Sequence, residues 1–280
     1  MNSNNPLAKH FRHPSIHFKL PSGGKFWPEG SLNLPLNGEI PIYPMTTRDE
    51  IVLRTPDALM NGSGVVEVIQ SCCPNILDAW QMPSIDVDAV LIAIRIASYG
   101  TSMEIDTICP ACKEEASYDV PLDPILAGIQ APNYSQDLKV AGVSLSFKPQ
   151  AYFTATKINI VRFQEDQIIR TIGDTELSDE ERKRIFDEQL ARLVDLNIDM
   201  IVESTAYIKT DEGVKVTERE FIKEFYENCE TKNMKAIRAY LDELRAVSKL
   251  PEQNTTCSSC NHKFKLALEF DQANFFAIGS

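Results

Sequence analysis

The spacing of hydrophobic and polar residues divides the chain into a mixed first part, a helical middle and a short end where residues alternate again. In the first part, apolar residues recur at helical spacing over 65–73 and 87–98. The first of these predicted helices has one apolar stripe. The second is apolar around most of its circumference, which favours a helix packed on several sides. Pro74 and Gly100 are typical helix stops.

Alternating patterns predict strands before and after these helices. Residues 32–36 alternate up to Asn37-Gly38, a dipeptide that favours a tight turn, and 39–43 is then predicted to return as the second strand of a hairpin. Pro41 lacks an N–H, so we expect that strand at a sheet edge. Two further hairpins are predicted, the first from 103–107 with 116–120, and the second within 138–147.

From about Thr154 the pattern becomes helical and predicts four helices, interrupted by a short hairpin around 211–213. Helix starts are indicated by capping boxes, in which a hydroxyl and a carboxylate each accept from a backbone N–H at the helix start. Ser178 with Glu181 and Thr217 with Glu220 form two such pairs. A third box, Thr47 with Glu50, opens a short helix earlier in the chain. After Pro251 the alternation returns over 264–270.

These patterns predict an α+β fold, in which a β-hairpin and zinc-ribbon-like unit made of N-terminal and C-terminal parts carries a mostly helical insertion. We expect four regions. They are a flexible arm over 1–15, a β-hairpin and helix region with the first cysteine pair over 16–150, the helical insertion over 151–250, and a C-terminal part over 251–280 that packs back on 101–120.

Composition narrows the possible partners. The 280 residues include 43% hydrophobic ones, which is ample for a core, and carry a formal net charge of -12 with a pI near 4.9. Such a charge repels phosphate, so we expect neither nucleic acid nor an anionic membrane as a partner. No apolar run reaches the roughly 18 residues of a membrane span, and the N-terminus lacks a signal-peptide pattern. We therefore expect a cytosolic, reducing site of synthesis.

Two Cys-x-x-Cys pairs carry the strongest chemical signal. Cys109 with Cys112 and Cys257 with Cys260 each lie beside a predicted strand, and four thiolates complete the tetrahedral shell that a structural Zn²⁺ requires. Free thiols and a redox pair are the alternatives. A redox pair is expected at a helix start, whereas strands flank these cysteines. His262 is an alternative fourth ligand.

Other candidate residues have simpler explanations. His10, His13 and His17 lie in or next to the predicted arm and are expected to be solvated. Cys72, Cys73 and Cys229 fall in apolar helical patterns and are expected to act as small hydrophobic residues. The lone Arg95 in an apolar helix is expected to snorkel or to pair with a carboxylate. The phosphate-loop, serine-hydrolase and zinc-protease motifs are missing from the sequence, so we expect no enzyme and no small-molecule substrate.

An aromatic pair suggests a contact surface. Phe26 and Trp27 lie in a loop rich in Gly and Pro, and large aromatic side chains often anchor protein interfaces. Both are candidate partner-binding residues, and the alternative is that they cover the sheet.

Several motifs in the first half resemble those of the T-even-type bacteriophage baseplate proteins. "LPSGGKFWP" at 20–28 resembles an "LPS-x-G-x-FY" opening, although Trp27 stands where a Tyr is expected. "MTTRDEIVL" at 45–53 resembles an "MT-x-x-E/D-E-x-x-L" segment, and "LMNG" at 59–62 is similar to an "LL-x-x-G" turn. "LIAIRIASYG" at 91–100 precedes the first cysteine pair as the family's central helix does.

The resemblance covers roughly the first 120 residues and the last 25. It implies a structural or assembly protein of a contractile-tail baseplate, either a hub component or a hub assembly chaperone, with other tail proteins as partners. The expected locations are the host cytoplasm during assembly and the tail baseplate of the virion. The alternative function is a zinc-ribbon module that binds nucleic acid or the transcription apparatus. Lys263 and Lys265 hint at it, but Glu114, Glu115 and Asp119 offset their charge.

Overall fold

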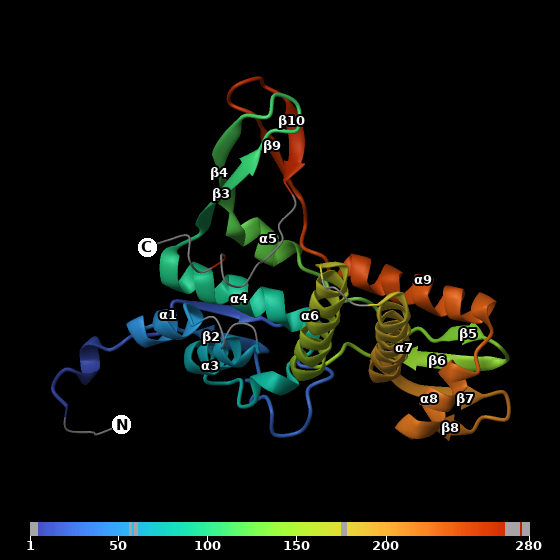
Figure 1. Ribbon diagram of the computed structural model, residues 1–280. Coiled ribbons are helices and arrows are strands. Elements are labelled where there is room, and N and C mark those ends of the chain that lie inside the picture. The colour runs from blue at the N-terminus through green and yellow to red at the C-terminus, as the bar shows by residue number, and fades with distance from the viewer. Residues whose placement is uncertain (1–4, 56–57, 59–60, 175–177, 267–274, 276–280) are drawn as a thin grey trace. The chain divides into compact units, whose positions relative to one another are not determined.

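The computed structural model has the predicted α+β composition and forms two compact units (Figure 1). Unit 1 comprises Met1–Ala131 together with Lys249–Ser280, and unit 2 is the continuous stretch Pro132–Ser248. The residues that the structure describes are 5–55, 58, 61–174, 178–266 and 275.

Helices form the centre of unit 1. Helix α4 (Ser84–Tyr99) is buried along most of its length, as its apolar circumference predicts, and Gly100 ends it at a φ of 96°. Helix α3 (Ser63–Cys72) buries the predicted stripe of Val65, Val68, Ile69 and Cys72. The other helices of this unit are α1 (Thr47–Leu53), the unpredicted α5 (Leu122–Gly128), and the 3₁₀ turns η1 (Ala8–His10) and η2 (Ala79–Gln81).

The first strand pairing differs from the sequence prediction. Strand β2 (Glu39–Ile42) pairs antiparallel with β1 (Ile16–Lys19), and not with residues 32–36. In that stretch only Leu32 makes a bridge, to Ile76. An alternating pattern within a short stretch does not show which distant strand is the partner. Strand β1 is further away in the sequence than residues 32–36, but its apolar residues lie on the same face as those of β2. Pro41 lies in this two-stranded sheet, where its missing N–H is tolerated.

Two details at the start of α1 also correct the prediction. The capping residue is Thr46, not Thr47, and its reciprocal partner is Asp49, not Glu50. The capping box begins one residue earlier than predicted because the Asp49 carboxylate is buried and also accepts a hydrogen bond from Arg12 at 3.3 Å. Arg12 additionally donates to the carbonyls of Pro44 (2.7 Å) and Ser71 (2.8 Å). The expectation of a flexible arm over 1–15 therefore fails at Arg12, which is tied to the helices.

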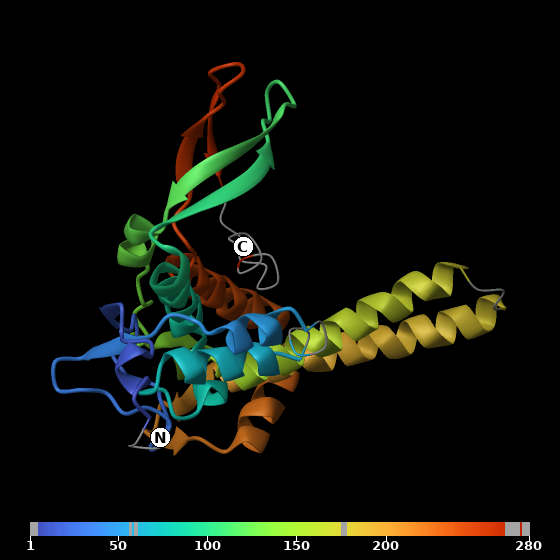
Figure 2. The ribbon, with the colours of Figure 1, turned by 90° about the vertical axis from the view of Figure 1, so that its left-hand side faces the viewer.

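Two hairpins extend from the helical part of unit 1 and lie side by side (Figures 1 and 2). The first pairs β3 (Ser102–Ile108) with β4 (Glu115–Pro121), as predicted. The second pairs β9 (Gln253–Thr256) with β10 (Lys263–Leu266). Strand β10 thus bonds to β9, while the hairpins touch through the rings of Tyr118 and Phe264, whose centroids are 5.7 Å apart. The remainder of the predicted 264–270 strand lies outside the described residues.

Unit 2 combines a four-stranded sheet with helices. Its strands pair in the order β5-β6-β7-β8, all antiparallel. They are β5 (Leu138–Val140), β6 (Val143–Phe147), β7 (Thr205–Thr210) and β8 (Lys215–Val216). The β5–β6 hairpin is predicted within the region 16–150, but β6 pairs with β7, so this hairpin belongs to unit 2.

The helices of unit 2 are α6 (Tyr152–Asp174), α7 (Asp179–Ser204), α8 (Arg219–Glu227) and α9 (Thr231–Val247). Helices α6 and α7 form an antiparallel pair (Figure 2). The Ser178 and Glu181 capping box starts α7 as predicted. The predicted box at Thr217 does not form, because Glu218 is the capping position of α8 and makes no side-chain cap bond.

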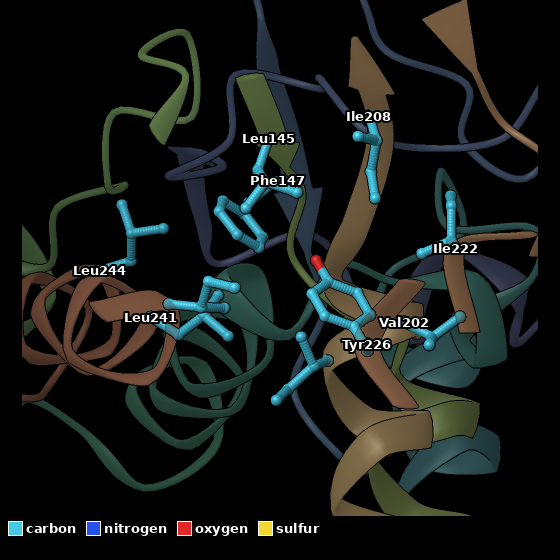
Figure 3. Close-up of a cluster of buried hydrophobic side chains, with 10 residues drawn as sticks. Leu145, Phe147, Val202, Ile208, Ile222, Tyr226, Leu241 and Leu244 are labelled. Atoms are coloured by element: carbon cyan, nitrogen blue, oxygen red, sulfur yellow. The ribbon is translucent and has the colours of Figure 1, made fainter. Parts of the chain in front are cut away.

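The core of unit 2 lies between the sheet and the helices (Figure 3). Leu145 and Phe147 from β6 face Leu241 from α9, while Tyr226 from α8 points its ring into the same cluster. The Tyr226 hydroxyl is 2.7 Å from Thr205 Oγ1, so the buried polar atom is paired. One continuous segment thus builds a complete apolar core.

Candidate metal centre

The tip of the first hairpin is a compact turn that presents two sulfurs. The Cys109 N–H donates to the Glu114 carbonyl at 2.9 Å, and the Cys109 carbonyl accepts from the Lys113 N–H at 3.0 Å. Lys113 takes a φ of 63°, a left-handed conformation that turns the chain back after Cys112. These bonds hold both thiols of the pair on one side of the turn.

The second hairpin repeats this geometry. The Cys257 N–H donates to the His262 carbonyl at 2.9 Å, and the Cys257 carbonyl accepts from the Asn261 N–H at 2.9 Å. Asn261, directly after Cys260, has a φ of 57°, a conformation that Asn adopts more readily than Lys does. Two segments far apart in the sequence therefore form matching knuckles.

The four sulfurs meet at one point. Cys109 Sγ lies 3.7 Å from Cys260 Sγ, and Cys112 Sγ lies 3.6 Å from Cys257 Sγ. All four sulfurs are within 4.8 Å of one another. A tetrahedron with metal–sulfur bonds of about 2.3 Å has sulfur–sulfur edges of about 3.8 Å, so the spacing suits a bound metal ion. The disulfide length of about 2.0 Å is far shorter, which fits the four thiols being free.

The surroundings make the thiols unequal. Backbone N–H groups of Cys260 and then Ser259 bond to the Cys257 sulfur and help lower its pKa to about 6. At Cys112 the backbone N–H of Glu114 also lowers the pKa, but desolvation and hydrogen bonds with the neighbouring sulfurs outweigh it and raise the pKa to about 12. A metal ion that binds all four as thiolates must displace protons, so its binding depends on pH.

The remaining ligand candidates lie elsewhere. Among the described residues, the group that can hold a metal consists of the four cysteines, without His262. The exposed His262 ring stacks instead on Phe264, with centroids 6.4 Å apart. Cys72 and Cys73 are fully buried, and Cys229 is half-buried in unit 2. Burial is the main cause that raises the pKa of Cys72 to about 12, which suits an inert thiol.

The two candidate contact residues differ in their environment. Phe26 is 44% exposed and adopts a φ of 68°, which is uncommon for a bulky residue. Trp27 is half-buried, and its indole N–H donates to Asp86 Oδ2 at 2.9 Å. Asp86 also accepts from the Ser22 N–H at 2.8 Å and the Ser22 hydroxyl at 2.6 Å. No pattern in the sequence indicates this role of Asp86, because its partners precede it by about sixty residues.

Arg95 is a second residue whose role the sequence did not indicate. It is only 2% exposed and donates through Nη1 to the Phe275 carbonyl at 2.5 Å. Its guanidinium lies 5.4 Å from the Tyr99 ring centroid and 5.3 Å from that of Phe275. Arg95 therefore does not snorkel to the surface, and it holds Phe275 from the C-terminal segment against α4.

The fold and the cysteine cluster together define a mixed α+β protein in which two segments far apart in the sequence converge on four cysteines that could hold a metal ion. Over residues 13–277 the chain matches the model of a family described as T4 bacteriophage base plate protein. The chain belongs to this family and is thus a bacteriophage baseplate protein. Its family associates it with other phage structural proteins and with the virion tail. No curated protein and no solved structure was found to match the chain.

Within the described residues, none of the helices is both long enough and apolar enough to cross a bilayer.

Proposed function

We propose that this protein is a non-enzymatic scaffold of the phage baseplate hub, as a hub component or a hub assembly chaperone, and that a structural Zn²⁺ closes its unit 1. The observation that carries the zinc assignment is the spacing of the four sulfurs, 3.6 and 3.7 Å across the two knuckles. Four thiolates are a donor set that Zn²⁺ prefers, and they leave no open position for substrate.

The zinc would act by joining distant parts of the chain. Cys109 and Cys112 belong to the β3–β4 hairpin, whereas Cys257 and Cys260 follow the whole of unit 2 in the sequence. Neither hairpin has many buried side chains of its own, so apolar burial contributes little there. A bound metal supplies the missing free energy and keeps the C-terminal segment on unit 1.

Metal analysis of the purified full-length chain tests this assignment. We expect one zinc per chain, and reaction of Cys109, Cys112, Cys257 and Cys260 with a thiol reagent only after a chelator has removed the metal. A chain that contains no zinc, takes up none and shows four freely reactive thiols would refute the zinc site.

For the contact with neighbouring tail proteins we propose Phe26 and Trp27. An exposed aromatic residue in a strained backbone conformation often marks a functional surface, and Phe26 fits that description. The bond from Trp27 to Asp86 would hold the loop in place. The partners proposed here are proteins, and the net charge of -12 argues against nucleic acid and anionic membranes.

Substitution of Phe26 by Ala tests the contact surface. Complementation of a phage that lacks the gene should yield fewer assembled baseplates, while the thermal midpoint of the isolated protein stays unchanged. Leu36→Ala is the matched control, because Leu36 is a fully exposed apolar residue of the same unit. Equal assembly with both variants would remove Phe26 from the contact surface.

Two further measurements separate the remaining alternatives. Quantitative mass spectrometry of purified virions distinguishes a hub component, which stays in the particle, from a chaperone, which is present only in the infected host cytoplasm. Filter binding at low salt tests the nucleic-acid module. We expect no salt-sensitive binding, since Lys265 is already paired with Glu252 at 2.8 Å.

A further inference from the structure

The hydroxyl group of Tyr118 is buried beside the cysteine cluster without a recorded partner. Tyr118 lies on β4, is 8% exposed, and its Oη makes no hydrogen bond within the part of the chain that the structure describes. An unsatisfied buried hydroxyl costs about 1–3 kcal/mol, and native proteins rarely keep one without a reason. The buried Tyr118 hydroxyl therefore needs a hydrogen-bond acceptor.

The surroundings of the ring place this hydroxyl between the two hairpins. The Tyr118 ring meets Phe264 of β10 edge to face, at an interplanar angle of 89°. On its own hairpin Tyr118 lies opposite Ile105. Tyr118 follows Cys112 by six residues, and Phe264 follows Cys260 by four, so the aromatic contact forms just below the two knuckles.

The cysteine sulfurs are close enough to the hydroxyl to influence it. Desolvation is the largest cause that raises the pKa of Tyr118, and the nearby sulfurs of Cys257, Cys109 and Cys112 raise it as well. A phenol O–H is a hydrogen-bond donor, and the thiolates of a metal centre are acceptors. The group is thus a donor that faces acceptors.

We propose that Tyr118 is a positioning residue of the metal centre, whose hydroxyl donates a hydrogen bond to the Cys257 thiolate when the four cysteines hold their metal. This inference rests on the metal site of the proposed function. Four thiolates around one Zn²⁺ leave a net negative charge, and outer donors to sulfur stabilise such charge and orient the ligands. Tyr118 comes from the first hairpin and Cys257 from the second, so the bond joins the two segments.

The test compares metal affinity in two Tyr→Phe variants of the full-length chain. Tyr118→Phe keeps the ring and its contact with Phe264 but removes the donor, so we expect zinc affinity, measured by competition with a chromophoric chelator, to fall about 10–100-fold. Tyr226→Phe is the matched control. It removes a buried hydroxyl in unit 2 that is paired with Thr205, and we expect its zinc affinity to equal that of the wild type.

The outcomes separate this inference from the zinc site itself. If the wild type binds no metal, the proposed zinc site fails. If the wild type binds zinc and Tyr118→Phe binds it equally well, only the role of Tyr118 is overturned. Should Tyr118→Phe fail to fold, NMR of the zinc-loaded wild type decides: a slowly exchanging Tyr118 hydroxyl proton supports the bond, and rapid exchange with solvent refutes it.

Discussion

The two units of this protein are held together in different ways. Unit 2 is one continuous stretch, and its sheet and helices bury a shared core that includes Leu145, Tyr226 and Ile237. Unit 1 is assembled from two segments that are separated in the chain by all of unit 2, and their hairpins meet at four sulfurs. Apolar burial suffices where a sheet and several helices can cover one another. A paired set of two-stranded hairpins has too little apolar surface and needs another bond.

The comparison also holds within unit 1. Helix α4 and its neighbours bury a large apolar set, whereas the hairpins bury only a few side chains besides Cys109 and Cys257. The dependence on the proposed Zn²⁺ should therefore be confined to the hairpins. We therefore expect metal loss to affect the two hairpins and to leave the helices of unit 1 folded.

Loss of the metal should have the largest effect. Cys257→Ser removes one of four ligands, and structural zinc sites contribute on the order of 10 kcal/mol to folding. We expect hydrogen exchange to become rapid over 102–121 and 253–266 while 132–248 keeps its protection. Cys229→Ser in unit 2 is the control and should retain the zinc. Loss of protection throughout unit 2 in Cys257→Ser would contradict independent closure of the two units.

A cavity in the core of unit 2 should have the next largest effect. Ile237 is fully buried on α9, so Ile237→Ala should reduce the free energy of unfolding by about 2–5 kcal/mol in a denaturant titration. Zinc content should remain that of the wild type. Val247→Ala, on an exposed position of the same helix, should change stability by less than about 0.5 kcal/mol. A zinc content that falls with Ile237→Ala would show that the units are coupled.

The buried carboxylate of unit 1 should have an intermediate effect. Asp86→Asn places an N–H group among three donors from Ser22 and Trp27, so we expect a loss of about 1–3 kcal/mol, observed with a change in tryptophan fluorescence. Glu67→Gln, on the exposed side of α3, is a suitable control. An Asp86→Asn protein as stable as the wild type would show that the amide can rearrange its bonds.

The same residue predicts a pH dependence. Burial raises the pKa of Asp86 in the folded state, although bonds from Ser22 and Trp27 oppose the shift. The folded state therefore holds this proton more tightly than the unfolded state does. The contribution of Asp86 to stability falls as the pH rises from the unfolded pKa of about 3.9 to the raised folded value. The stability difference between wild type and Asp86→Asn, followed by denaturation across this range, should change accordingly.

The smallest predicted effect distinguishes the two knuckles. Lys113 has a φ of 63° and Asn261 one of 57°, but Asn tolerates this conformation better. Lys113→Gly should therefore stabilise the metal-bound form by about 0.5–1 kcal/mol in thermal unfolding, and Asn261→Gly should gain less. A larger gain at Asn261 would show that strain is not what separates the two turns.

Local features of the fold could be predicted, because they depend on a few neighbouring residues. The Ser178 capping box, the β3–β4 hairpin and the buried circumference of α4 agree with the structure. The predictions were wrong where a residue or strand that is distant in the sequence determines the local structure. Strand β2 pairs with β1, Thr46 replaces Thr47 as the capping residue, and the β5–β6 hairpin belongs with β7.

The sequence by itself determined which four cysteines form the candidate metal site, since two Cys-x-x-Cys pairs beside strands have few other uses in a chain of this composition, and the structure brings their sulfurs together. It also determined the helical pattern of most of unit 2. Only the tertiary structure placed Tyr118 against Phe264, Arg95 on Phe275 and Asp86 between Ser22 and Trp27. The physical reason is that local propensity acts over a turn or two of chain, whereas these contacts join residues that only the packed fold brings together.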